Sequence, residues 1–221
     1  MDPRQWHESL ATYQDFGDYL KASTNGTAHH AELRLRMAQN LWVVSVEDCF
    51  AIGYLVKQRL LASARSLIRP QFEALARGAW LSQCASPEQI GQIAAGQPGF
   101  PRKLSRIIES LMESPVSFSI AGAPISFRSF YDRMADSMND LTHRGTRVIG
   151  RRMVGSREGA ESIDADEPAL FLLGTLHGGL AAAAMVEVIG QSEKAQDICV
   201  RCMQTANRWV TAPTPPSVAQ P

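Results

Sequence analysis

The amino-acid sequence predicts an all-α protein, a multi-helix bundle with a buried central helix. Apolar residues recur along most of the chain with the spacing of amphipathic helices. The alternation that marks strands is almost absent, and Pro and Gly stand where the helical patterns start and stop. Since 45% of the 221 residues are hydrophobic and only 20% are charged, the chain is long and apolar enough to bury a core.

The individual helices are predicted from this periodicity and from the Pro, Gly and Asn residues that mark helix ends. Asn25 and Gly26 close the first helix, and Pro87 and Pro168 each stand at the start of a later one. The predicted helices cover residues 4–22, 30–58, 61–84, 87–95, 101–113, 126–154, 167–189 and 191–210. Residues 114–126 and 155–166 lack a strong pattern and are predicted to be loops.

The second predicted helix is apolar on more than one side, which indicates the central helix of the bundle. Its two apolar sets are Leu33, Met37, Leu41, Val44 and Leu55 on one side and Trp42, Val46, Cys49 and Val56 on another. Asp48 projects with the first set, so its carboxylate needs a hydrogen-bond donor inside the bundle. The candidate donors are Arg69, Arg77 and His143.

Residues 1–212 are expected to form a single helical domain. Residues 213–221 hold four prolines and no aromatic residue, and we expect them to be a disordered tail. The N-terminus lacks the apolar stretch of an export signal, which favours the cytoplasm. Lys plus Arg and Asp plus Glu both number 22, so no overall charge attracts the chain to nucleic acid or to anionic membranes.

Residues 169–186 are nearly apolar and approach the length of a membrane span. A buried core helix is favoured, because many of these residues are Ala or Gly and because a histidine in mid-span would be costly. That histidine, His177, precedes Gly178 and Gly179. The two glycines either admit a neighbouring backbone closely or open room for a ligand, and His177 is a candidate ligand-binding residue.

Arg69, Glu73 and Arg77 recur every four residues and therefore share one face of the third predicted helix. Apolar neighbours place Glu73 at the edge of the core, where a carboxylate requires cationic partners. The stripe is either a structural ladder of ion pairs or a ligand-binding site. Pro70, within the same pattern, either starts a new helix or kinks a longer one.

Asp140 and His143 lie one turn apart on the sixth predicted helix. A carboxylate three residues before a histidine can orient the imidazole and raise its basicity, which makes both residues candidate catalytic groups. A hydrogen-bonded structural histidine and a single metal ion shared with Glu73 are the alternatives. No cofactor and no di-metal centre is predicted, because the chain has only one such unit and its C-x-x-C stands alone.

A basic cluster follows His143, in which Arg144, Arg147 and Arg151 share a face. Arg147 and Arg151 are candidates for holding phosphate groups of RNA or of a nucleotide. A solvated basic face that pairs with the acids after residue 157 is the alternative interpretation.

Two motifs give the sequence a resemblance to a family of uncharacterised bacterial helical proteins. They are R-P-x-x-E, which starts at Arg69, and N-D-x-T-H-x-G, which starts at Asn139, and Phe100-Pro101-Arg102-Lys103 stands between them. The likeness extends over residues 30–205. It implies a helical fold and the importance of Arg69, Glu73, Asp140, Thr142 and His143, and it names no reaction.

A looser resemblance is to helical HEPN-type proteins, many of which are RNA-cleaving toxins or phage-defence effectors. In those proteins an Arg shortly precedes a His on one helix. Here the nearest Arg before His143 is Arg133, which lies too far upstream for that arrangement.

Two hypotheses result. The first is a cytoplasmic, homodimeric helical module whose polar cluster organises the fold or lines a small-ligand pocket. This hypothesis does not imply catalysis. The polar cluster consists of Arg69, Glu73, Arg77, Asp140 and His143. The second is a metal-independent ribonuclease or nucleotide-processing effector in stress or phage defence. In it His143 acts as general base while Arg147 and Arg151 hold phosphate.

Overall fold

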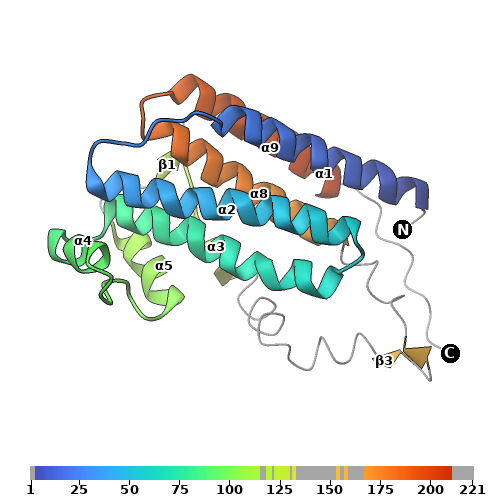
Figure 1. The fold of residues 1–221 in the computed structure, drawn as a ribbon, viewed down its shortest axis with the longest axis horizontal. Helices are drawn as coiled ribbons and strands as arrows, with labels where there is room; N and C mark the ends of the chain where they lie inside the picture. The colour runs from blue at the N-terminus through green and yellow to red at the C-terminus, as the bar shows by residue number, and fades with distance from the viewer. Residues whose placement is uncertain are drawn as a thin grey trace.

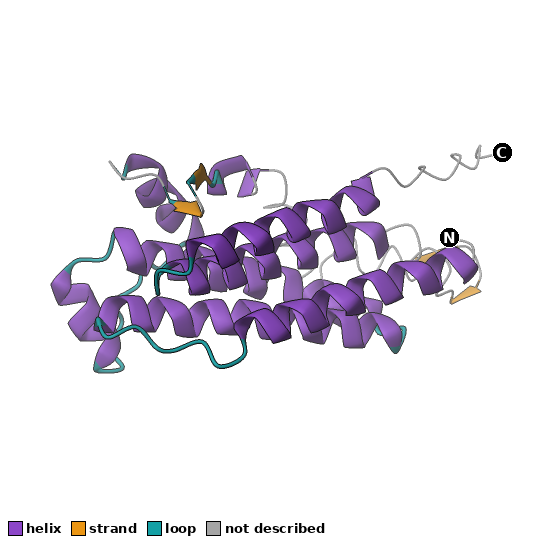
Figure 2. Cartoon of the chain, turned by 90° about the horizontal axis from the view of Figure 1, so that it is seen from above, coloured by secondary structure: helices purple, strands orange, loops and turns teal. Residues whose placement is uncertain are grey.

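The long helices of the protein form a bundle, which confirms the all-α class (Figure 1). The computed structural model describes residues 3–114, 118–120, 122–129, 131–132, 153–154, 157–158 and 167–210. The long helices are α1 (Pro3–Thr24), α2 (Leu33–Lys57), α3 (Leu61–Gln83), α8 (Glu167–Glu187) and α9 (Ser192–Val210). They run along the length of the molecule in both views (Figure 2). The shorter α4 (Pro87–Ala94) and α5 (Leu104–Glu113) lie at one end, where α5 packs on α3.

The helices begin and end near the Gly and Pro residues from which the sequence predicts their ends. Beyond α1, Gly26 has a φ of +71°, a conformation that glycine adopts at little cost. At the start of α4 the Ser86 hydroxyl accepts a hydrogen bond from the Gln89 backbone N–H at 3.2 Å, and the Gln89 side chain accepts from the Ser86 N–H at 2.9 Å. Pro87 takes the first helical position, where its missing N–H costs nothing.

The predicted helix over residues 126–154 is wrong at its end. Met153–Val154 forms β3, which pairs antiparallel with β4 (Arg157–Glu158). Gly155 follows β3 in the sequence, and hairpin turns favour glycine. Within the segment predicted to be the first loop, β1 (Ser119–Ile120) pairs with β2 (Ala123–Pro124) in the same way.

The centre of the bundle is α8 rather than the second predicted helix. Leu33 and Val44 of α2 are 41% and 44% exposed, whereas Met37, Leu41 and Leu55 of the same set are partly buried against the core, so that side of α2 is only partly enclosed. The other side of α2, with Trp42, is buried as expected. The spacing of apolar residues shows which face of a helix is apolar, but it does not show whether neighbouring helices are available to cover that face. By contrast, α8 touches α1, α2, α3 and α9.

Among the described residues, α8 is the one helix long and apolar enough to cross a membrane, and 78% of its most apolar stretch is buried inside the bundle. Three glycines bring its neighbours close. A Cβ atom at Gly178 would lie 2.7 Å from the Cβ of Cys49 on α2, and one at Gly179 would lie 2.8 Å from the Cβ of Cys202 on α9. A Cβ at Gly174 would collide with the Tyr13 hydroxyl of α1. These glycines therefore serve close helix packing.

Buried hydrogen bonds join the same helices. The Tyr13 hydroxyl donates to the Cys49 carbonyl oxygen at 2.9 Å and so links α1 to α2. The Gln71 side-chain amide of α3 donates to the carbonyl oxygens of Ser45 on α2 and Gly174 on α8, both at 3.2 Å. Since buried polar groups are costly unless they are paired, these bonds fix the relative positions of the helices as well as stabilising them.

We expect Gly178→Ala to lower the free energy of unfolding by about 1–3 kcal/mol, because the added methyl group overlaps the Cys49 side chain. Gly91→Ala in α4 is the matched control: nothing lies within 4 Å of its Cβ position, and the loss of a helical glycine should stabilise the protein by roughly 0.5–1 kcal/mol. Urea unfolding of both variants measures this difference. A Gly178→Ala protein as stable as Gly91→Ala would contradict the close approach.

Candidate functional site

The charged stripe on α3 is present as a ladder of ion pairs. The Nε atom of Arg69 lies 2.8 Å from Oε1 of Glu73, and Nη2 of Arg77 lies 3.6 Å from Oε2 of the same carboxylate. The three side chains are each 24–25% exposed, so solvent reaches them only in part. α3 runs through Pro70 without a break, so the proline lies inside one longer helix.

One member of the stripe escaped the sequence prediction. Arg65 lies one turn before Arg69 on α3, and only 5% of its surface is exposed. Its spacing of four residues from Arg69 was a usable signal, but burial of the guanidinium depends on neighbouring elements and is not visible in the sequence. Arg65, Arg69, Glu73 and Arg77 thus follow one another along α3 at intervals of four residues.

Aromatic side chains lie beside the end of the stripe nearest α4. The Arg77 guanidinium carbon lies 5.1 Å from the centre of the Phe100 ring, within the range of a cation–π contact. The Phe100 ring in turn lies 5.8 Å from the ring of the buried Trp80. This arrangement covers one face of the guanidinium and leaves its N–H edges to make hydrogen bonds.

The chain after the β1–β2 hairpin approaches the middle of α3. Phe127 is buried, and its ring lies 6.3 Å from the ring of Phe72. Phe118 lies between Phe127 and Trp42, at 5.4 and 6.2 Å from their rings. Phe72 belongs to the same helical turn as Arg69 and Glu73, so this part of the chain packs against α3 at the level of the stripe.

The candidate catalytic residues Asp140 and His143 lie outside the described residues, as do Thr142, Arg147 and Arg151. Their convergence on Arg69, Glu73 and Arg77 stays a prediction.

His177 lies in the core of the bundle. It is fully buried on α8, and its ring lies 5.2 Å from the ring of Phe72. Burial lowers the pKa of the imidazole to about 3, because the interior solvates a cation poorly. His177 is therefore neutral at pH 7. In that state it can form hydrogen bonds but carries no charge for an anion.

The donor expected for Asp48 is not Arg69 or Arg77, and this part of the prediction is wrong. Both guanidinium groups bind Glu73 on their own helix, where a spacing of four residues brings the partners together without any contribution from α2. Asp48 is half-buried, and its Oδ2 atom has no hydrogen-bond partner in the described part of the chain. Burial, with Glu47 nearby, raises the pKa of its carboxyl group to about 6.

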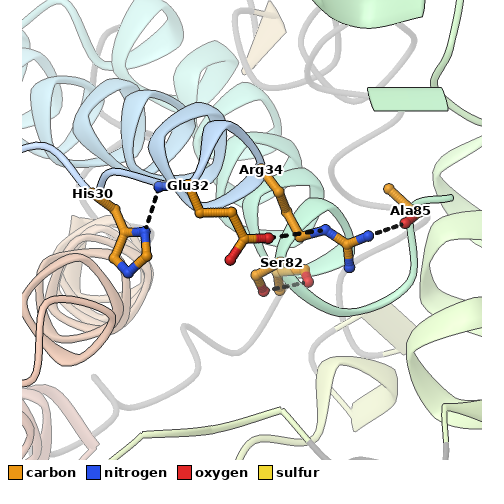
Figure 3. A network of polar contacts seen from close by, with 6 residues as sticks. His30, Glu32, Arg34, Ser82 and Ala85 are labelled. Atoms are coloured by element: carbon orange, nitrogen blue, oxygen red, sulfur yellow. Dashed lines mark hydrogen bonds and ion pairs between the residues drawn. The ribbon is translucent and has the colours of Figure 1, made fainter. Parts of the chain in front are cut away.

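A second polar network lies where α2 begins (Figure 3). Nη2 of Arg34 donates to the Ala85 carbonyl oxygen at 2.8 Å, and Nε of Arg34 lies 3.8 Å from Oε1 of Glu32. The Glu32 backbone N–H donates to Nδ1 of His30 at 3.0 Å. Because Arg34 satisfies a carbonyl just beyond α3, we interpret this network as a structural clamp between α2 and the end of α3.

In the residues that the structure describes, no group of three His, Cys, Asp or Glu side chains lies close enough together to hold a metal ion.

The fold and the stripe define a class: an α-helical bundle that carries a partly buried, arginine-rich ladder on one of its inner helices. The chain belongs to a family of unknown function, DUF6988, whose model matches residues 42–201. The match begins within α2 and ends within α9, and it includes the whole stripe. Searches of curated proteins and of solved structures give no match.

We expect the stability of the protein to fall as the pH drops from 6.5 toward 3, in part because of His177. Its folded-state pKa of about 3 lies below the ordinary 6.5, so between these values the unfolded chain binds the proton and the folded chain does not. The contribution of neutral His177 to the free energy of unfolding is fully present above pH 6.5. Below pH 6.5 this contribution falls by up to about 1.4 kcal/mol per pH unit. Urea unfolding of the wild type and of His177→Gln at several pH values measures the difference. Equal pH slopes would contradict it.

Asp48→Asn should stabilise the protein at pH 7.5, because the charged carboxylate is partly desolvated and the amide is neutral. Because the pKa of Asp48 is raised in the folded state, the variant's gain in stability is fully present above pH 6. The gain shrinks as Asp48 is protonated in the folded wild type, and it is absent below pH 3.8. We expect at most about 1 kcal/mol, since solvent screens a half-buried group. Chemical unfolding at pH 7.5 and 3.5 tests this. A loss of stability at pH 7.5 would show that the carboxylate is needed in its charged form.

Proposed function

We propose that the protein is a small-ligand-binding helical module and that its site is built on the stripe of α3. The observation that carries the proposal is the partly exposed Arg77 guanidinium, which lies 3.6 Å from the Glu73 carboxylate and against the Phe100 ring. A guanidinium held on a partly buried face favours an anionic ligand that bears carboxylate or phosphate groups.

Arg77 is the described residue best arranged to meet such a ligand. Its ion pair with Glu73 is long, at 3.6 Å, and Phe100 lies against its guanidinium. A guanidinium held in this way keeps N–H donors for a planar or tetrahedral anion, and the aromatic ring limits its movement. Arg69, by contrast, holds Glu73 through a short contact of 2.8 Å and positions the carboxylate.

The remaining parts of the proposed site are Asp140, His143, Arg147 and Arg151. Two observations support their inclusion: Phe127 packs on Phe72 between the stripe residues, and Asp140 follows Phe127 in the sequence by only thirteen residues. In the proposal Asp140 orients His143, and Arg147 and Arg151 add donors for phosphate.

The binding proposal predicts that Arg77→Gln weakens binding of an anionic probe by about tenfold, since one charge-assisted contact is lost. The probes are ATP and citrate, measured by calorimetry at constant ionic strength. Arg36→Gln, an exposed arginine of α2, is the control and should bind as the wild type does. Arg77→Gln should cost less than about 1 kcal/mol of stability, so a folding defect does not explain the loss. Wild-type protein that binds neither probe would contradict the proposal, and so would an Arg77→Gln variant of unchanged affinity.

The alternative function is a HEPN-like metal-independent ribonuclease or nucleotide-processing effector. An RNA cleavage assay distinguishes it from ligand binding. We expect the wild type and His143→Ala to show the same background cleavage of single-stranded RNA in the presence of a chelator. Cleavage by the wild type that His143→Ala abolishes would replace the binding function by a ribonuclease with His143 as general base.

A further inference from the structure

A pocket lies in the groove between α1 and α9, apart from the stripe of α3. On α9 it is lined by Arg201, Gln204, Thr205 and Arg208, which recur at intervals of three and four residues and therefore share one helical face. Its volume is about 90 Å³, room for a few water molecules or for one small polyatomic ion.

The facing wall comes from α1. Thr12 and Asp15 line the pocket there, and the buried ring of Phe16 contributes its apolar part. Thr12 accepts a hydrogen bond from Nη1 of Arg208 at 3.4 Å, which joins the two helices at one end of the groove. The lining is thus a ring of guanidinium, hydroxyl and amide groups with one carboxylate.

The two guanidinium groups of the pocket are not used in ion pairs with the acids of the described residues. Asp197, one turn before Arg201, accepts a hydrogen bond from the Tyr19 hydroxyl at 2.6 Å. Arg201 lies over the ring of Tyr19, at 5.8 Å from its centre. Two guanidinium groups against Asp15 leave the pocket with one excess positive charge, which favours an anion.

We propose that this pocket binds inorganic phosphate in its hydrogen phosphate form. Arg201 and Arg208 donate to the phosphate oxygens, and Gln204 and the threonine hydroxyls add uncharged donors. Asp15 decides between anions, because an ionised carboxylate only accepts hydrogen bonds. Hydrogen phosphate offers it an O–H near neutral pH. Sulfate and the dianion of a phosphate monoester do not, so their oxygens face the Asp15 carboxylate without a proton between them.

The pocket is independent of the proposed function on α3. Its α1 residues and Arg208 lie outside the range that the family model matches, residues 42–201, whereas the stripe lies inside it. The two sites use different helices, so variants of one leave the lining of the other intact.

The experiment titrates inorganic phosphate, sulfate and methyl phosphate into the full chain at pH 7.5, with sodium chloride holding the ionic strength constant. Calorimetry should show phosphate binding about tenfold tighter than either other anion. The double variant Arg201→Gln/Arg208→Gln should lose at least about tenfold in phosphate affinity. Asp15→Asn should reduce the preference for phosphate over sulfate, because an amide can also donate to a fully deprotonated oxygen.

Two matched variants complete the test. Arg36→Gln controls for a change of surface charge, and Arg77→Gln separates this pocket from the stripe; both should bind phosphate as the wild type does. If the double variant does not fold, Arg208→Lys takes its place in the test. This variant keeps the positive charge but loses the two parallel N–H donors of the guanidinium, so it should bind phosphate less tightly than the wild type. The proposal is overturned if phosphate binds no better than chloride at equal ionic strength. It is also overturned if the arginine variants bind normally, or if Arg77→Gln alone removes binding.

Discussion

The close approach of α8 to its neighbours is the constraint on which the rest of the structure depends. Gly174, Gly178 and Gly179 leave no side chain between α8 and the helices α1, α2 and α9. Backbone carbonyls then come within reach of side chains on the facing helices, as the Gln71 amide shows at Gly174. The order of the helices around α8 decides how far the stripe of α3 is covered and which faces of α1 and α9 form a groove.

The helices and one set of side-chain pairs could be predicted from the sequence because both depend on local spacing. A repeat of four residues brings Arg69, Glu73 and Arg77 together on any α-helix, whatever surrounds it. The burial of Arg65 and the exposure of Val44 were not predictable in this way, since both depend on which neighbours cover a face. The short pair of strands at Met153 was missed for a different reason, because strands of two residues each are too short to stand out from a helical pattern that extends over many residues.

The same distinction explains the two polar sites. The stripe is contained in one helix, so its residues are recognisable in a single stretch of sequence. The pocket joins Thr12 and Asp15 to Arg201 and Arg208, which stand nearly two hundred residues apart. Pairing α1 with α9 brings them together, and no motif marks the pairing. Asp48 is a further case, because a carboxylate in an apolar run suggests a partner, whereas its Oδ2 atom has no hydrogen-bond partner among the described residues.

The tight contacts of α8 also determine the reactivity of two cysteines. Cys49 and Cys202 are fully enclosed where they meet Gly178 and Gly179, and burial raises the pKa of both thiols, to about 12 for Cys49. Neither thiol forms the thiolate that attacks alkylating reagents while the helices remain packed. Their modification can begin only after α8 separates from α2 or α9. The two sulfur atoms therefore act as built-in reporters of how often the bundle opens.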